Sequence, residues 1–164
     1  ASTVQSWFKP SAYAVILLRE AGTPCVFWGD LFGTPETGDL PAVAELPLLM
    51  TIRRALAHGP QHDAFDAPDV VGFAREGDDA HPGSGLAAVL SDRLAGAKRL
   101  YVGTRHAGKK WVSVVGGHEP VVVGDDGVVE LSVSDGGLSV YVPEAAKPML
   151  DGAEEYRLRV GSGD

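Results

Sequence analysis

The sequence predicts a mixed α and β fold, in which a helical first third precedes an antiparallel Greek-key β-sandwich. Residues 1–60 contain four valines against eight leucines and eight alanines, whereas residues 70–142 contain fifteen valines. Leucine and alanine favour helices, and valine favours the pleated surface of a sheet. Turn signals recur about every ten residues in the second part, a spacing typical of β-sandwiches. The 21 glycines and 11 prolines of the chain are therefore interpreted mainly as turn residues.

Two helices and one buried strand are predicted in the first part. A helix is expected over residues 6–21, with Gly22 in position to end it. The short apolar run at 24–28 has the pattern of a strand buried on both faces, as in parallel sheets. A second helix is expected over residues 42–57, where Pro47 marks a kink or a late start.

The predicted buried strand has no parallel neighbour in the sequence around it. An isolated parallel strand leaves its backbone hydrogen-bonding groups unpaired. We therefore expect the sequence to be the C-terminal end of a larger barrel or sheet. For the same reason we expect residues 7–28 to expose apolar surface in the isolated chain.

Seven short strands are predicted in the second part, separated by turns such as Asp-Gly pairs that favour tight hairpins. They are expected at residues 70–75, 86–90, 98–102, 110–115, 121–123, 128–133 and 138–142. Alternating patterning in strands of this length indicates an antiparallel sandwich with Greek-key connections. After these strands, residues 144–164 are interpreted as a tail, in which residues 156–160 are a candidate edge strand.

Composition disfavours several classes of partner. The formal net charge is −8 and no run of Lys or Arg exceeds two residues, so neither a nucleic acid nor an anionic membrane surface is expected as a partner. The longest apolar run, residues 12–18, is too short to span a bilayer. Cys25 is the single cysteine, and its place within the predicted buried strand indicates a small core residue rather than a nucleophile.

Most chemical groups in the sequence match no catalytic pattern. The glycine-rich stretches lack the spacing of a dinucleotide or phosphate-binding loop, and no nucleophile elbow is present. Of the five histidines, His58 and His62 are four residues apart, but Gly59 and Pro60 break any helix between them. A zinc site built on that pair is therefore not expected.

Two carboxylates differ from the many that lie in predicted turns. Asp69 precedes the strand predicted at 70–75, and Asp92 follows the strand predicted at 86–90. If these strands pair as a hairpin, both carboxylates lie at the same end of it. Oxygen ligands that converge in this way suit calcium.

The sequence resembles the closing segment of α-amylases of glycoside hydrolase family 13, of the liquefying, maltohexaose-forming type and their fungal relatives. The resemblance covers about residues 5–143, in order and with similar spacing. It is carried by WFKP (7–10), AYAVILLR (12–19), PCVFWGD (24–30), GPQHD (59–63), DVVGFAREGD (69–78), SGLAAVLSD (84–92), KRLYVG (98–103) and LSVYV (138–142).

The resemblance implies the end of a (β/α)8 barrel followed by the antiparallel domain called C in this family. It identifies the seventh barrel helix with residues 6–21, the eighth strand with 24–28 and the eighth helix with 42–57. The implied division is a barrel remnant, a sandwich domain and a tail, over 1–60, 61–143 and 144–164. The family hydrolyses internal α-1,4-glucosidic bonds of starch with retention of configuration, through three carboxylates on barrel strands four, five and seven. None of these strands lies in this sequence, so no catalytic residue is assigned and the chain is expected to be inactive alone.

The resemblance also implies two kinds of site. Trp28, Gly29 and Asp30 lie at the catalytic end of the eighth strand, where they would line the α-glucan cleft or anchor a loop. A calcium ion that bridges barrel and C-terminal domain in related bacterial enzymes uses positions that match Pro68, Asp69 and Asp92, with the rest of its ligands from a barrel loop outside this sequence. Arg93 stands where the family often has glycine, and it places a positive charge beside the expected ion.

A different class of function is also compatible with the sandwich. The alternative is a carbohydrate-binding or protein-interaction module, which would present exposed aromatic side chains. Tyr101 and Trp111 are the candidates, and both also fit a core. Against this alternative, a binding module has no need of the buried strand at 24–28. The sequence leaves localisation open between an intracellular enzyme of fungal type and a secreted one.

Overall fold

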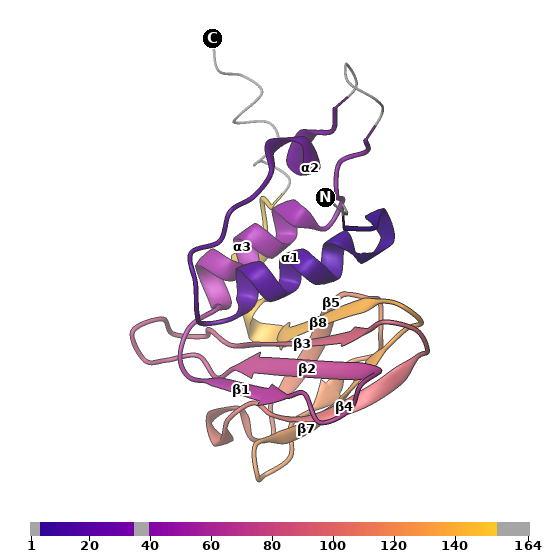
Figure 1. Ribbon diagram of the computed structural model, residues 1–164. Helices are drawn as coiled ribbons and strands as arrows, with labels where there is room; N and C mark the ends of the chain where they lie inside the picture. The colour runs from indigo at the N-terminus through magenta and orange to yellow at the C-terminus, as the bar shows by residue number, and fades with distance from the viewer. Residues whose placement is uncertain (1–3, 35–39, 154–164) are drawn as a thin grey trace.

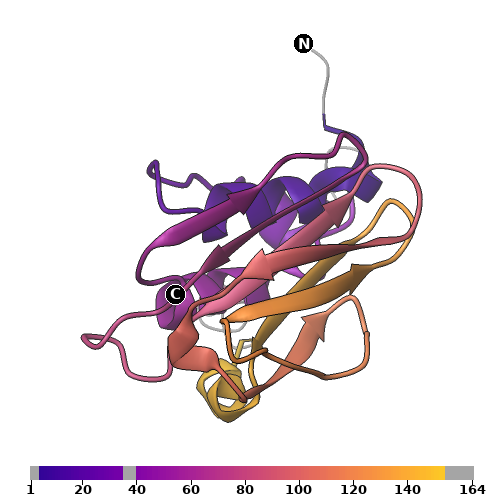
Figure 2. The same ribbon diagram turned by 90° about the horizontal axis from the view of Figure 1, so that it is seen from below.

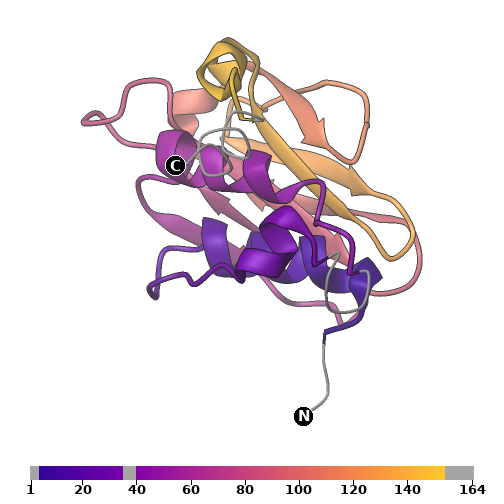
Figure 3. The same cartoon turned by 90° about the horizontal axis from the view of Figure 1, so that it is seen from above.

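The computed structural model describes residues 4–34 and 40–153 of the chain. The N-terminal helices lie on one face of a six-stranded antiparallel sheet, and a two-stranded sheet packs against the opposite face (Figure 1). The strands are seen from below in Figure 2, and the helices that cover them are seen from above in Figure 3. The predicted mixture of N-terminal helices and a following antiparallel sheet is confirmed, and the described residues form no closed barrel.

Both helices predicted in the first part of the chain are formed, as α1 (Lys9–Leu18) with its preceding turn η1 (Ser6–Phe8) and as α3 (Leu46–Leu56). The other helical elements are α2 (Trp28–Phe32), η2 (Thr104–His106) and η3 (Glu144–Leu150). The helix predicted over 6–21 is therefore divided into η1 and α1 and ends at Leu18. Pro47 lies in the first turn of α3, where its missing N–H costs no hydrogen bond. It marks the late start rather than a kink.

The strands include all seven that the sequence predicts, with ends shifted by no more than two residues. They are β1 (Gln61–Ala64), β2 (Val70–Arg75), β3 (Leu86–Ser91), β4 (Gly96–Tyr101), β5 (Lys110–Val115), β6 (Val121–Val122), β7 (Val128–Val133) and β8 (Leu138–Pro143). Every pairing between them is antiparallel. The larger sheet has the order β1-β2-β3-β8-β5-β6, and β4 pairs with β7 in the smaller one. The chain thus leaves the larger sheet for β4, returns to it for β5 and β6, leaves it again for β7, and returns as β8 between β3 and β5.

The strand predicted at residues 24–28 is not formed, and this expectation was wrong for the described structure. Phe27 has an extended backbone, with φ −75° and ψ 128°, but Trp28 already begins α2. The physical reason is that no parallel strand among the described residues is available to pair with this segment. Cys25 is consequently exposed, and its interpretation as a core residue was also wrong.

Four described elements were not predicted. Two of them are short helices: α2 begins at the end of the predicted strand 24–28, and η2 lies between β4 and β5. The strand β1 has the polar sequence Gln-His-Asp-Ala, which carries no apolar alternation, yet it pairs along its full length with β2. The helix η3 occupies the start of the segment interpreted as a tail, and it buries Ala146 and Leu150 in the core beneath α3. The candidate edge strand at 156–160 lies outside the described residues.

Two apolar cores occupy the two faces of the larger sheet. The first joins α1 and α3 to that sheet, with Leu18, Leu46 and Ile52 from the helices at 0% exposure. The second lies between the two sheets and is centred on Trp111 and Tyr141. The larger sheet is therefore covered on both sides by elements of this chain. Among the described residues no helix has the length and apolarity needed to cross a membrane.

Candidate functional site

The hairpin of β2 and β3 brings Asp69 and Asp92 together, as predicted. Val70 pairs with Ser91 in the last register position of the hairpin, and Asp69 and Asp92 are the residues that flank this pair. The backbone N–H of Asp92 donates to the carbonyl of Asp69 at 3.3 Å. Both residues therefore lie at the same end of the hairpin. Their role as calcium ligands stays a prediction.

The surroundings of this pair fit a hard cation. Pro68, Asp69 and Asp92 are all exposed, and neither carboxylate makes a hydrogen bond or ion pair with another described residue. Calcium takes six to eight oxygen ligands, so two carboxylates and one carbonyl supply only part of a shell. Arg93 is exposed as well, so its cationic end is free to point into solvent.

The predicted cleft residues divide between the surface and a buried anchor. Trp28 is 63% exposed and packs its ring on Phe32, with 4.7 Å between ring centroids. Asp30 is only 7% exposed, where it accepts hydrogen bonds from Lys9 Nζ at 2.5 Å and from Tyr13 Oη at 2.7 Å. Burial, together with the hydrogen bond to this carboxylate, raises the pKa of the Tyr13 hydroxyl. Asp30 therefore ties α2 to α1 in this structure.

An apolar groove of about 340 Å³ opens beside this anchor. Its lining includes Val4, Ile16 and Trp28. Trp7 and Phe27 are also more than half exposed. The expectation of exposed apolar surface over residues 7–28 is thus confirmed. Large apolar patches on a protein surface commonly mark contact with another folded segment.

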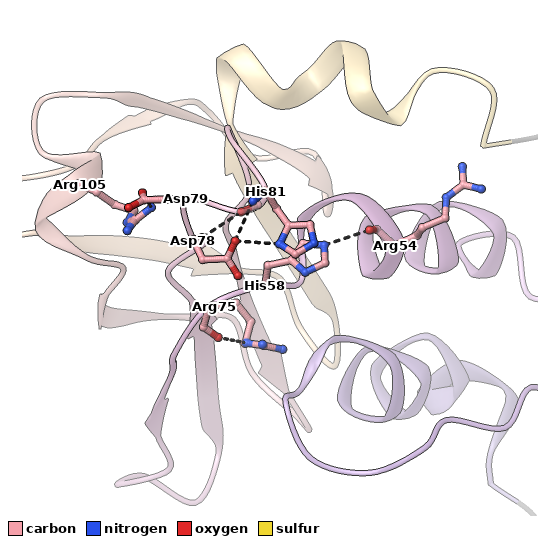
Figure 4. A network of polar contacts seen from close by, with 9 residues as sticks. Arg54, His58, Arg75, Asp78, Asp79, His81 and Arg105 are labelled. Atoms are coloured by element: carbon pink, nitrogen blue, oxygen red, sulfur yellow. Dashed lines mark hydrogen bonds and ion pairs between the residues drawn. The ribbon is translucent and has the colours of Figure 1, made fainter.

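His58, Asp78 and His81 form a cluster that the sequence did not predict. His58 does not approach His62 as a ligand partner. It stacks instead on His81, with 3.5 Å between the ring centroids and 4° between the planes (Figure 4). Asp78 Oδ1 accepts a hydrogen bond from His81 Nδ1 at 2.8 Å. The spacing Asp78-x-x-His81 was the only local signal, and the approach of His58 depends on how the end of α3 meets the β2–β3 loop.

Comparison with known proteins supplies the family. No protein-family model matches the chain. It is 47% identical over 145 residues to an α-amylase from Bacillus licheniformis, an alignment that covers 86% of this chain and 28% of the relative. The chain is homologous to α-amylases. An α-amylase from Geobacillus stearothermophilus is 44% identical over 143 residues, covering 87% of this chain and 26% of the relative.

A third relative has a more specific name. A glucan 1,4-α-maltohexaosidase from Bacillus sp. (strain 707) is 41% identical over 143 residues, which are 86% of this chain and 27% of that protein. The chain thus spans little more than a quarter of the length of the α-amylases that it matches. The resemblance to α-amylases of glycoside hydrolase family 13 stated from the sequence is confirmed over most of the chain.

Proposed function

We propose that this chain is the C-terminal part of a retaining α-amylase that hydrolyses internal α-1,4-glucosidic bonds of starch and related glucans. The observation that carries the proposal is the mismatch of coverage, because 86% of the chain aligns with only 28% of its relative. In this proposal the catalytic carboxylates belong to the part of the enzyme outside this chain. The chain alone is then inactive.

The exposed apolar groove supports the same proposal. A barrel remnant over residues 1–60 would bury Trp7, Ile16 and Phe27 against the rest of the barrel. The segment 24–28, which forms no strand in this structure, would then have parallel neighbours on both edges and correspond to the eighth barrel strand. Residues 61–143 would be the domain called C, which packs against the barrel through α1 and α3. The segment 144–164 would follow as a tail, with η3 as its first turn.

Asp30 has a positioning role in this proposal. Its carboxylate is held by Lys9 and Tyr13, so it fixes the turn at the end of the eighth strand. Trp28, by contrast, is free to contact an α-glucan or the neighbouring barrel loops. Neither residue is assigned to bond cleavage.

Calcium would be held by the carbonyl of Pro68 and the carboxylates of Asp69 and Asp92, together with oxygen ligands from the rest of the enzyme. The ion supplies a fixed positive charge that draws oxygen ligands of two segments together. The residues of this chain contribute two free carboxylates, held close by the hydrogen bond between the backbones of Asp92 and Asp69. Because the shell is incomplete, the chain alone binds calcium weakly. Submicromolar affinity of the isolated chain in calorimetry would contradict this proposal.

The activity is tested by comparing the chain alone with a chimera. The chimera joins the N-terminal portion of the Bacillus licheniformis α-amylase, up to the start of the aligned segment, to this chain. We expect no release of reducing sugar from soluble starch by the chain or by the N-terminal portion separately, and hydrolysis by the chimera. Hydrolysis by the chain alone, or a folded chimera without activity, would overturn the proposal.

The alternative of a carbohydrate-binding module is weakened by one observation. Trp111, one of its two candidate aromatic residues, has 0% exposure and lies in the core between the sheets. Tyr101 is exposed but contacts His62 edge-on at 4.8 Å, and the two do not form a flat platform for a sugar ring. Sedimentation of the isolated chain with insoluble starch separates the two ideas, since strong retention would favour the binding module.

A further inference from the structure

His58, Asp78 and His81 come from two segments that meet at the end of α3. His58 follows this helix directly, while Asp78 and His81 belong to the loop between β2 and β3. One ligand atom from each of the three residues lies within 4.8 Å of the other two. We propose that these three side chains bind a divalent transition-metal ion of the Zn²⁺ type. The proposal does not depend on the glucan-hydrolysing function.

The backbone holds the two segments together without a metal. The N–H of Gly77 donates to the carbonyl of His58 at 2.9 Å, and the N–H of Gly85 donates to the carbonyl of Leu56 at 3.0 Å. Gly59 allows this close approach, because a Cβ built on it would lie 2.0 Å from the carbonyl oxygen of Gly77. The positions of the three side chains are therefore set by packing of the main chain, which lowers the ordering cost of binding an ion.

The hydrogen bonds leave a lone pair for a metal on His58. Its Nε2 lies 3.1 Å from the carbonyl oxygen of Arg54. A carbonyl only accepts, so Nε2 carries the proton and Nδ1 keeps the free lone pair. Histidines that bind metals usually donate their other ring N–H to a carbonyl or carboxylate in this manner. Of the two ring nitrogens of His58, Nδ1 is therefore the one that can bind an ion in this tautomer.

A metal ion can replace the proton between His81 and Asp78. Nδ1 and the backbone N–H of His81 each donate to Asp78 Oδ1 at 2.8 Å. An aspartate is ionised at neutral pH, as a ligand must be, and these hydrogen bonds lower the pKa of the Asp78 carboxyl further. On metal binding, the imidazole proton of His81 passes through solvent to Nε2, and Nδ1 and the carboxylate share the ion.

Coordination requires the stacked rings to open. The lone pair of each imidazole lies in its ring plane, and the two planes are parallel within 4°. The side chain of His81 is 47% exposed and lies in a loop, so this ring has room to tilt. Tetrahedral zinc holds nitrogen and oxygen donors about 2.0–2.2 Å from the ion, which places two donors about 3.4 Å from each other. Donor atoms that lie up to 4.8 Å apart must therefore approach each other by as much as about 1.4 Å.

The donor set selects the class of ion, and the neighbouring charges limit its affinity. Two imidazoles and one carboxylate suit zinc, nickel or copper, whereas calcium takes oxygen ligands alone. The site is therefore chemically distinct from Asp69 and Asp92. Arg53, Arg54 and Arg75 line a pocket of about 470 Å³ that His58 also borders. These cations oppose a dication, and we expect micromolar rather than nanomolar affinity.

Calorimetry with ZnCl₂ tests the proposal on the 164-residue chain. The chain is first treated with EDTA and then kept in excess calcium, so that hard-oxygen sites do not compete. We expect one zinc equivalent at pH 7.5, with affinity reduced at least tenfold in His81→Ala and in Asp78→Asn. His118→Gln is the matched control, because His118 lies elsewhere and belongs to no described metal-ligand group. Its zinc affinity should equal that of the unsubstituted chain.

Cobalt gives an independent spectroscopic readout. Co²⁺ in a site with nitrogen and oxygen donors of low coordination number absorbs visible light much more strongly than hexaaqua Co²⁺. We expect this absorption to appear with the unsubstituted chain and with His118→Gln, and to be lost in the double variant His58→Ala/His81→Ala. Thermal unfolding without metal verifies that each variant is folded. Absence of saturable zinc binding, or equal binding by the folded double variant, would overturn the proposal.

Discussion

The sheet region (residues 61–143) and the helical region (residues 4–34 and 40–57) differ in how fully they cover their own apolar side chains. In the sheet region the larger sheet is covered by helices on one face and by β4 and β7 on the other. Trp111 is fully buried there. In the helical region Trp28 is 63% exposed, and Phe27 is 59% exposed. One region is closed by this chain, and the other has an apolar face with no described element over it.

The backbone shows the same difference. Each strand of the sheet region pairs with at least one antiparallel neighbour. The extended backbone around Phe27 belongs to no strand among the described residues. Antiparallel strands complete their pairing with short hairpins, whereas a parallel strand needs distant segments of the chain. The antiparallel strands therefore pair within the described residues, whereas a parallel strand at 24–28 would have no partner among them.

Two tryptophans give the largest expected difference between the regions. Trp111→Ala removes a side chain with 0% exposure from the core between the sheets. We expect it to lower the free energy of unfolding by about 3–5 kcal/mol, as large-to-small substitutions in cores do. Trp28→Ala removes an exposed side chain and should change the free energy by less than about 0.5 kcal/mol. Urea unfolding followed by circular dichroism measures both, and equal losses would break the comparison.

The junction between the regions is tested next. Gly59→Ala adds a Cβ 2.0 Å from the carbonyl oxygen of Gly77, at a position with φ +74°. Left-handed strain of about 1–2 kcal/mol and an overpacking cost of about 1–3 kcal/mol should together remove roughly 3 kcal/mol of stability. Gly108→Ala is the matched control, because its φ is +71° but nothing lies within 4 Å of the added Cβ. Gly108→Ala should lower the free energy of unfolding by only about 1–2 kcal/mol. Equal losses at both positions would mean that the backbone around Gly77 moves to accommodate the added Cβ at little cost.

The sequence predicted the sheet region better because local pattern decides most of it. The strands β2 and β7 alternate or concentrate apolar residues and are bounded by turn residues, so their ranges were predicted without change. The strand β1 was not predicted, because its polar residues are held in a strand by pairing with β2 and not by burial. In the helical region, the segment at 24–28 carries the pattern of a buried parallel strand, but no described residues pair with it. Pattern alone could not decide its structure here.

The candidate sites follow the same rule. Asp69 and Asp92 could be placed together because a hairpin fixes which residues lie at its ends. The approach of His58 to His81 could not be predicted, because it depends on the packing of α3 against a loop. Asp30 was predicted only as a residue that lines a cleft or anchors a loop. Its burial with Lys9 supports the second role.

Asp30→Asn should sharpen the comparison by loosening the helical region alone. The substitution removes the negative charge of Asp30, which Lys9 and Tyr13 contact. This charge is shielded from solvent, because the side chain of Asp30 is 11% exposed and that of Lys9 is 17% exposed. We expect a loss of about 2 kcal/mol, in the range of hydrogen bonds to charged groups. Asp79→Asn, which breaks an exposed ion pair with Arg105, should cost less than about 0.5 kcal/mol. Hydrogen exchange should localise the effect of Asp30→Asn to α1 and α2, and faster exchange in β3 or β8 would contradict this separation.

Acid should act first on the sheet region, through His106. This ring is 3% exposed, donates from Nε2 to the carbonyl of Glu76 at 2.7 Å and meets Trp111 edge-on. Burial lowers the pKa of the His106 imidazole below the ordinary value of a histidine, which is about 6.5. As pH falls below about 6.5, the unfolded chain takes up a proton that the folded chain resists, so the free energy of unfolding declines until the pH reaches the folded pKa. The fluorescence of buried Trp111 should report this loss as a lower urea midpoint at pH 5 than at pH 7.

The contribution of His106 is separated from that of the other histidines by two variants. His106→Gln keeps an N–H donor for the carbonyl of Glu76, whereas His106→Phe keeps an aromatic ring beside Trp111. Both remove the titrating group, so both should make the urea midpoint less dependent on pH between 5 and 7, whatever they do to stability at neutral pH. We expect this change in the free energy of unfolding to be the smallest of the four, because the protonation of one histidine contributes less than the loss of a core side chain. If both variants keep the full pH dependence of the urea midpoint, protonation of His106 does not cause the loss of stability. The acid-sensitive group would then lie elsewhere in the chain.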